Sequence, residues 1–418
     1  MNIRKVAFRI IYAGLLLVAT GILLEIGGRY LPVAGKATKP SNVSFVFDKD
    51  VGKWHRANST GTWNSACYEI GDIHFNGFGM RDRERKIEKE KYRIAILGDS
   101  MIEALQVRDQ EVVNRVMEKR LADRVEVLNF GMSGFGTVEE LVAYRTKVAP
   151  FHPDVVVVAF LPKNDVRDNS MPLRSRALEG WGDEPPENVP FFGLNRQGEL
   201  VQIYWPREDR YADKAKKSAT PKRGLLSRSR AYQLCQHFYT EVLWPGWQRL
   251  RWWAGSGNRI PSLDRSEDWH LGVYMEPQGE WAPAWEITEK TLLLFKKEVE
   301  QQGAKLVVIT LPTDFELDVN PEKEYFVRTG YRFPSGFDVT YPHRRLAAFC
   351  KQNGILFKSM YEPFMRYRNE HGMTHKPYMG RWCDGHYSPL GHRLLAENLS
   401  SYLSDQGIFS TEAQIPRP

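Results

Sequence analysis

The fold is decided by one stretch of the sequence, Arg93-Ile94-Ala95-Ile96-Leu97-Gly98-Asp99-Ser100. A short apolar run that ends in Gly-Asp-Ser predicts a buried strand that leads into a tight turn. In α/β proteins such a turn lies at the carboxyl end of a strand, where ligands usually bind. Ser100 is therefore a candidate for chemistry as well as for structure.

Strands and helices alternate after this stretch. Apolar residues at helical spacing predict a helix over 112–122, and a second helix follows over 138–148. Residues 125–129 and 154–160 read as strands, and the latter is apolar on both faces. This alternation, with fully apolar strands, predicts a parallel sheet covered by helices on both sides.

The same pattern returns nearer the C-terminus, and the predicted elements there are a helix over 288–303, a strand over 305–311, a helix over 344–353, a strand over 355–357 and a last helix over 389–403. The five β-α units predict an α/β fold, a three-layer α/β/α flavodoxin-like sandwich around a five-stranded parallel sheet. We place this domain at residues 92–405.

A large insertion at 165–285 separates the two halves. It holds nine of the twelve tryptophans, which are Trp181, Trp205, Trp244, Trp247, Trp252, Trp253, Trp269, Trp281 and Trp285. Because it enters after the end of a strand, we expect it over the ligand crevice of the sheet. Two interpretations stay open: a cap that stacks on sugars, and a small aromatic core that stabilises the insertion.

The N-terminus has the layout of a signal anchor. The uncharged run Ile10–Leu24 follows a basic cluster, so we expect residues 1–31 to form a single transmembrane helix. The basic flank places the N-terminus in the cytoplasm and the catalytic domain outside it, in the periplasm or at the cell surface. A cleaved signal peptide and a buried helix are the alternatives. Residues 32–91 read as a linker and irregular lead-in, and 406–418 as a tail.

Composition excludes some classes of partner. The chain has 58 Lys and Arg against 51 Asp and Glu, a net charge of +7, and no basic block that resembles a nucleic-acid patch. The four cysteines, Cys67, Cys235, Cys350 and Cys383, form no C-x-x-C pair, so we expect no zinc or other metal. In an exported domain they could make up to two disulfides in three pairings, or stay free.

Four short segments carry residues suited to chemistry. Ser100 follows the first strand, Gly134 the second and Asn164 the third, while Asp384-Gly385-His386 precedes the last helix. Strand ends of a parallel sheet converge on one edge, so we expect these segments to meet there.

The residue types fit nucleophilic catalysis. His386 would take the proton of Ser100, and Asp384 would hold the imidazole ring. The backbone N–H groups of Ser100 and Gly134 and the side-chain amide of Asn164 would form an oxyanion hole.

Other polar residues compete for these roles. His392 is a rival base, but it falls inside the last helix, where we expect it to pack. We expect Asp99 to form structural hydrogen bonds. Asp165, Asp168 and Asn169 could line the crevice or belong to a solvated loop.

The four segments resemble the blocks of the SGNH, or GDSL-like, hydrolases, over roughly residues 92–165 and 285–405. The lead-in Asn76-Gly77-Phe78-Gly79-Met80-Arg81 and the tail segment 384–392 resemble those of membrane-anchored bacterial members. The resemblance implies the α/β/α fold and hydrolysis of acyl esters without a metal or organic cofactor.

Two positions depart from the family pattern. The third block is usually Gly-x-Asn-Asp, but here it is Pro162-Lys163-Asn164-Asp165, which implies a stiffer backbone. The usual Asp-x-x-His is shortened to Asp384-Gly385-His386, a spacing similar to that of polysaccharide O-acetylation proteins.

Three functions follow as hypotheses. The first is a serine esterase that removes an acetyl or other small acyl group from an extracytoplasmic glycan, an acylated polysaccharide. The second is a polysaccharide O-acyltransferase that uses the same triad. The third is a non-catalytic, membrane-tethered glycan-binding protein.

Overall fold

A computed structural model describes residues 41–64, 68–122, 124–181, 189–204, 238–255, 269–372, 378–380 and 384–408, with isolated positions at 12–27, 232, 235 and 236. The chain forms two compact units. The smaller unit comprises Met1–Lys36, Glu208–Ile260 and Glu322–Arg332, and the larger unit comprises Ala37–Arg207, Pro261–Pro321 and Phe333–Pro418.

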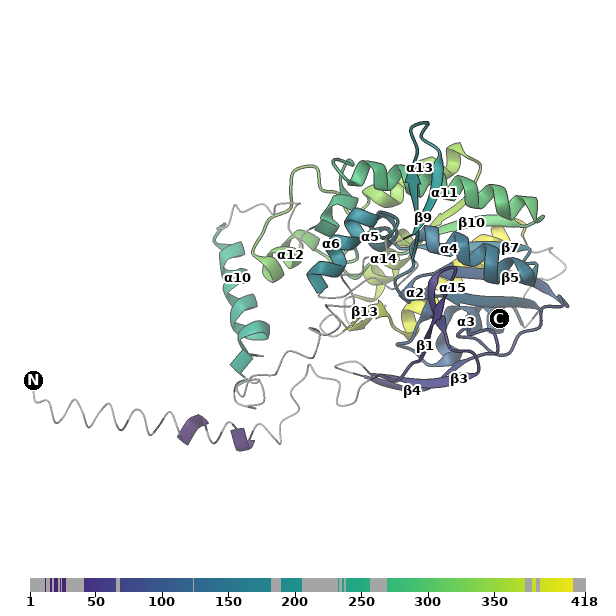
Figure 1. The fold of residues 1–418 in the computed structure, drawn as a ribbon. Coiled ribbons are helices and arrows are strands. Elements are labelled where there is room, and N and C mark those ends of the chain that lie inside the picture. Colours follow the sequence, from purple (N-terminus) through teal and green to yellow (C-terminus); the bar gives the residue numbers. More distant parts are fainter. Residues whose placement is uncertain are drawn as a thin grey trace, which may run out of the picture. The chain divides into compact units, whose positions relative to one another are not determined.

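The larger unit is built on a five-stranded parallel sheet in the order β11-β10-β7-β5-β6 (Figure 1). The strands are β5 (Tyr92–Gly98), β6 (Val125–Gly131), β7 (Val155–Phe160), β10 (Lys305–Thr310) and β11 (Leu356–Ser359). The chain winds outward in opposite directions from β5, so the direction of winding reverses between β5 and β7, the position where ligands usually bind in sheets of this kind. The predicted five-stranded parallel sheet is confirmed.

Helices cover both faces of this sheet, as predicted (Figure 1). Ala95 and Leu97 of β5 share one core with helices α4, α11 and α13, whereas Ile94 and Ile96 share another with α3, α14 and α15. This alternation is the period of two expected of a strand buried on both sides. The helices are α3 (Val113–Arg120), α4 (Thr137–Ala143), α11 (Trp281–Gln301), α13 (Tyr341–Gln352), α14 (Tyr361–His371) and α15 (Pro389–Asp405).

Helix α11 begins seven residues before the predicted start at 288, and this changes the role of two tryptophans. Trp281 and Trp285, which we assigned to the insertion, are buried in the main core. The guanidinium of Arg345 lies 4.8 Å from the ring centroid of Trp285. These two residues therefore belong to the main core of the domain and not to a separate aromatic core of the insertion.

The lead-in is more regular than predicted. It contains two antiparallel hairpins, β1 (Phe45–Asp48) with β2 (Gly52–His55), and β3 (Ser59–Asn64) with β4 (Glu69–Phe75). Trp54 and Met80 are buried in the main core, so tertiary packing fixes this segment. Of the lead-in predicted over 32–91, the description as irregular was therefore wrong for residues 45–75, whereas residues 76–91 contain no helix or strand.

The insertion is divided between the units. In the larger unit it forms α5 (Pro162–Asp168), α6 (Met171–Trp181), the hairpin β8 (Pro190–Leu194) with β9 (Leu200–Tyr204), and a 3-10 helix, η5 (Trp269–Tyr274). In the smaller unit, helix α10 (Trp244–Trp253) packs Trp252 against Phe326 of α12 (Pro321–Thr329), with ring centroids 5.4 Å apart. A cap over the crevice stays a prediction.

The predicted anchor at 1–31 lies mostly outside the described residues, as do 28–40 and 409–418. Among the helices in the described ranges, none is both long and apolar enough to cross a bilayer. Cys67 and Cys383 also fall outside those ranges, whereas Cys235 and Cys350 carry free thiols, the first exposed and the second buried.

Candidate active site

Ser100 begins the short helix α2 (Ser100–Glu103) at the carboxyl end of β5. Asp99 caps this helix, and its carboxylate accepts a hydrogen bond of 2.9 Å from the Met101 N–H. A Cβ at Gly98 would lie 2.4 Å from Ile102 Cγ1, so only glycine lets the helix fold back so closely on the strand. The Gly-Asp-Ser turn therefore presents a partly exposed Ser100 among buried neighbours.

His386 reaches Ser100 from the other end of the chain. Its Nε2 lies 2.8 Å from Ser100 Oγ, a hydrogen-bond distance. It lies on strand β13 (Asp384–Tyr387), which pairs with β12 (Tyr378–Gly380). The next residue, Tyr387, is buried and donates its hydroxyl to the Pro312 carbonyl at 3.0 Å, which holds the strand in place.

Asp384, the predicted third member of the triad, begins strand β13 two residues before His386. Its side chain lies outside the described part of the structure. Its role as the partner of the imidazole stays a prediction.

Gly134 lies in the loop after β6, with a positive φ of 73°. The loop is joined to the nucleophile turn by a hydrogen bond of 3.0 Å from the Met132 N–H to the Gly98 carbonyl. Arg174 donates to the Gly134 carbonyl at 2.8 Å and so fixes this peptide. Neither Ser100 nor Gly134 donates its backbone N–H to another described residue, so both donors are available to an oxyanion.

Asn164 lies beside the nucleophile turn, because its Nδ2 donates to Asp99 Oδ2 at 2.8 Å. It belongs to helix α5, which begins at Pro162. Proline suits the first position of a helix, so the departure from Gly-x-Asn-Asp is accommodated by helical backbone. The structure thus links Asn164 through Asp99 to Ser100.

His392 lies in α15 and is fully buried. Burial lowers the pKa of this imidazole to about 3, with smaller contributions from the charges of Arg81 and His386. Neither ring nitrogen has a hydrogen-bond partner among the described residues, and the ring packs against Tyr387 with centroids 6.1 Å apart. A histidine that stays neutral and packs in this way agrees with the structural role expected of it.

Asp168 and Asn169 do not form a solvated loop. Both are buried, Asp168 in an ion pair with Arg167. Asn169 accepts a hydrogen bond of 3.0 Å from the Val138 N–H and donates one of 2.9 Å to Thr288, and so joins the end of α5 to α4 and α11. The interpretation as a solvated loop was therefore wrong for these two residues.

A layer of buried carboxyl groups, Asp99, Asp165 and Glu140, lies behind the site, and no motif in the sequence pointed to Glu140. Asp165 accepts hydrogen bonds from the Leu161 N–H at 2.6 Å and the Thr137 hydroxyl at 3.3 Å. The carboxyl oxygens of Glu140 have no hydrogen-bond partner among the described residues. Burial raises the pKa of both groups well above the usual range, and it also raises the pKa of Asp99.

A second cluster supports the loop after β6. Glu103 of α2 is buried, with His55 Nε2 2.6 Å from its carboxylate, and it also accepts a hydrogen bond from the Ser133 hydroxyl. Burial acts to raise the pKa of Glu103, but the hydrogen bond and the charge of His55 oppose it and the pKa is lowered. The cluster therefore ties α2, the loop after β6 and strand β2 together.

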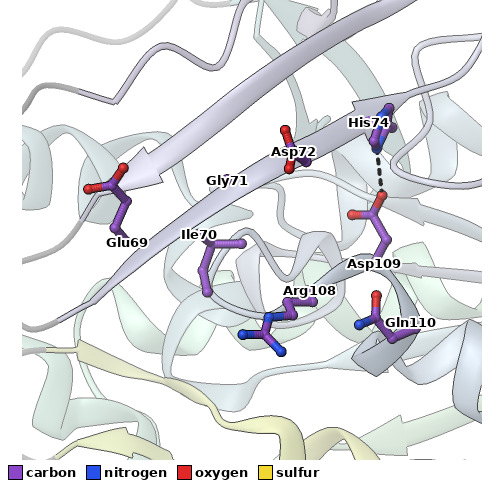
Figure 2. Close-up of a pocket in the computed structure, with 8 residues that line it drawn as sticks. All are labelled: Glu69, Ile70, Gly71, Asp72, His74, Arg108, Asp109 and Gln110. Carbon is purple, nitrogen blue, oxygen red and sulfur yellow. Dashed lines mark hydrogen bonds and ion pairs between the residues drawn. The ribbon is translucent and has the colours of Figure 1, made fainter.

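A polar hollow of about 400 Å³ lies elsewhere, between β4 and the turn at Asp109–Glu111 (Figure 2). Two of its lining residues, His74 and Asp109, are in direct contact, with 3.0 Å between Nδ1 and Oδ2. Its lining holds neither Ser100 nor His386. The described residues contain no cluster of side chains suited to a metal ion.

No family model matches the sequence, and no curated protein matches it. Solved structures similar to it include TesA, with 12% identity, a TM-score of 0.35, and coverage of 75% of this chain and 98% of that one. A catalytic mutant of Axe2, an acetylxylan esterase from Geobacillus stearothermophilus, has 12% identity, a TM-score of 0.36, and coverage of 76% and 96%. A GDSL-like lipase from Bacteroides thetaiotaomicron has 11% identity, a TM-score of 0.31, and coverage of 75% and 89%. The chain is thus similar to solved structures of GDSL-like hydrolases and acetylxylan esterases.

Proposed function

We propose that the protein is a serine esterase of the SGNH type, with Ser100 as nucleophile and His386 as general base. The observation that carries this proposal is the 2.8 Å separation of His386 Nε2 and Ser100 Oγ. A serine hydroxyl needs a base at this distance to become an effective nucleophile.

The reaction follows from the positions of these groups. His386 takes the hydroxyl proton while Ser100 Oγ bonds to the ester carbonyl carbon, and the carbonyl oxygen becomes an oxyanion. The N–H groups of Ser100 and Gly134 and the second N–H of the Asn164 amide bind that oxyanion. The C–O bond to the alcohol then breaks, and His386 returns the proton to the leaving oxygen. Water attacks the acyl-enzyme by the same route and releases the acid.

We assign to Asp384 the role of holding the imidazole and stabilising its protonated form. Its position two residues before His386 supports the assignment. We expect the acyl group to be small, an acetyl group, and the alcohol to belong to a glycan.

Hydrolysis of p-nitrophenyl acetate tests the mechanism. Ser100→Ala should abolish release of p-nitrophenol and labelling by a fluorophosphonate probe, while Ser401→Ala, an exposed serine on α15, should change neither. Undiminished hydrolysis by the Ser100→Ala protein would reject the serine mechanism.

A polysaccharide O-acyltransferase is the second candidate, favoured by the Asp384-Gly385-His386 spacing. It would pass the acyl group from Ser100 to a sugar hydroxyl instead of to water. Incubation with an acyl donor and a glycan distinguishes the two, because a transferase yields acylated glycan and an esterase yields free acid. The Ser100–His386 hydrogen bond argues against a purely glycan-binding protein.

We further propose that residues 1–31 tether the catalytic domain to the membrane, with that domain on the extracytoplasmic side. The support is the uncharged run Ile10–Leu24 behind a basic cluster. The full chain should fractionate with membranes, whereas a chain that lacks residues 1–31 should not. Recovery of the full chain in the soluble fraction would refute the tether.

A further inference from the structure

A lysine from the lead-in borders the loop after β6. A Cβ built on Gly134 would have the Nζ of Lys53 4.0 Å away and no other described atom within 4 Å. The space above Gly134 is therefore open, and an ammonium group lies at its edge. A substrate that reaches the Gly134 N–H passes close to this charge.

The fold explains how Lys53 arrives there. Lys53 and His55 share one face of strand β2, because side chains two apart in a strand point the same way. His55, on this face, has its Nε2 2.6 Å from Oε1 of Glu103, the last residue of α2. Trp54, between them, is buried in the main core and donates its indole N–H to the Phe78 carbonyl at 2.9 Å. Both neighbours anchor the strand, so Lys53 is held beside the loop.

The carboxylates that act on Lys53 are already engaged by other groups. These are Glu103, Glu139 and Asp168. Glu103 has His55 and Ser133 as partners, Glu139 forms an ion pair with Arg174 at 2.6 Å, and Asp168 pairs with Arg167. Within the described ranges, Lys53 itself has no hydrogen bond or ion pair, and its contact is with the ring of Phe45, 5.4 Å from Nζ to the centroid.

An ammonium group without an ion pair beside an open space is suited to bind an anion. Burial lowers the pKa of Lys53, with a further contribution from the nearby charge of Arg174. A bound carboxylate would offset both effects, because an opposite charge favours the protonated form.

We propose that Lys53 forms an anion-binding subsite next to the oxyanion hole, and that the ester substrate carries a carboxylate, as an acylated uronate-containing glycan does. The inference rests on the proposed function, since it names the substrate class of the same site. Lys53 acts in it as a specificity residue, because it binds a part of the substrate that does not react.

Two substrates and three variants test the subsite in the full chain. The substrates are acetylated polygalacturonate, which is acidic, and acetylated xylan, which is neutral. Lys53→Met should lower kcat/KM for the acidic substrate by about 10- to 100-fold through KM, as expected for loss of one charged hydrogen bond. It should leave the neutral substrate nearly unchanged. Lys53→Arg should retain most activity on both.

Lys49→Met is the matched control, because Lys49 lies exposed in the turn of the same hairpin and its loss makes the same change in net charge. It should leave both substrates unaffected. An equal loss of kcat/KM on both substrates after Lys53→Met would show that Lys53 stabilises the oxyanion directly, and it would overturn the proposed subsite. An unchanged kcat/KM on both substrates would overturn the subsite as well.

A binding measurement separates this inference from the proposed reaction. Calorimetric titration of the Ser100→Ala protein with oligogalacturonate needs no turnover. Affinity should fall about 10-fold or more when Lys53→Met is added, and it should weaken as salt rises. An unchanged affinity would overturn the subsite even if esterase activity is present. A wild-type protein that binds the oligomer through Lys53 but hydrolyses neither ester would refute only the proposed function.

Discussion

The imidazole of His386 and the hydroxyl of Ser100 lie 2.8 Å apart in space and 286 residues apart in sequence. His386 lies on strand β13, and Ser100 follows β5, which lies between β7 and β6 in the sheet. The contact therefore depends on the whole larger unit folding correctly, and it is absent from any local segment of the chain.

The two histidines near the C-terminus should differ sharply in their effect on turnover. His386→Ala should lower kcat by about 10²–10⁴-fold, because it removes the base that contacts Ser100. His392→Leu should leave kcat near that of wild type and stability equal or higher, because it replaces a buried ring whose nitrogens have no described partner. Steady-state kinetics with thermal melts measure both. Loss of turnover in the His392 variant with retention in the His386 variant would reverse the assignment.

Alanine at Gly131, the last residue of β6, should affect stability, whereas alanine at Gly134, in the loop that follows, should affect activity. At Gly131 a Cβ would lie 2.2 Å from the Glu103 nitrogen and 2.5 Å from the Ile102 carbonyl carbon, which are backbone atoms. Gly131→Ala should therefore displace α2 and lower the melting temperature strongly. Gly134→Ala meets no such clash and should add only the strain of a positive φ, roughly 1–2 kcal/mol.

The Gly134→Ala protein should nevertheless lose kcat/KM, because its methyl group enters the open space above the loop. Thermal melts and kinetics on both alanine variants check the pair. A Gly131→Ala protein as stable as wild type would contradict the packing described for α2 on β6.

The sheet could be predicted because its strands are buried on both faces and so appear as apolar runs. The interior positions of β5, β7 and β10, at 94–97, 155–159 and 306–309, are all Val, Ile, Leu or Ala. The turn at Gly98-Asp99-Ser100 could also be predicted from the sequence. Its glycine is required because α2 packs closely on β5 through Ile102, and this glycine is part of the Gly-Asp-Ser motif.

The strands and buried polar residues that surround the site could not be predicted in this way. Strands β1 and β2 have four residues each and mixed composition, too short for a periodic signal. The contacts of β2 with Glu103 and Gly134 join residues about 50 and 80 positions apart, and no spacing rule links them. Asn169 likewise bonds to α4 and α11, which are distant in sequence, so its polar side chain alone suggested exposure to solvent.

Asn164→Ala should lower kcat by about 10²–10³-fold with little change in KM, because an oxyanion donor acts in the transition state. Asp99 would also lose its 2.8 Å partner, although it keeps the Met101 N–H. Asn195→Ala, in the exposed turn after β8, serves as the control. Kinetics on p-nitrophenyl acetate give both constants. A rise in KM alone would place Asn164 in substrate binding instead.

Glu140→Gln should change how stability depends on pH. The pKa of Glu140 is raised well above its usual 4.5, chiefly by burial and then by the charge of Asp99. Above pH 4.5 the unfolded chain therefore releases this proton while the folded protein keeps it. Stability of the wild type falls as pH rises through this window, by up to about 1.4 kcal/mol per pH unit from this one group.

Glutamine keeps the size of the side chain and has no proton to lose. The Glu140→Gln protein should match the wild type near pH 4 and become more stable than it as the pH rises above 4.5, until the pH passes the raised pKa of Glu140 in the folded protein. Urea midpoints at these pH values measure the difference, with Glu370→Gln as a control at an exposed glutamate. A difference in stability between the wild type and Glu140→Gln that stays constant from pH 4 to pH 8 would show that the pKa of Glu140 is not raised on folding. That result would contradict the prediction, which rests on the burial of Glu140 without a hydrogen-bond partner among the described residues.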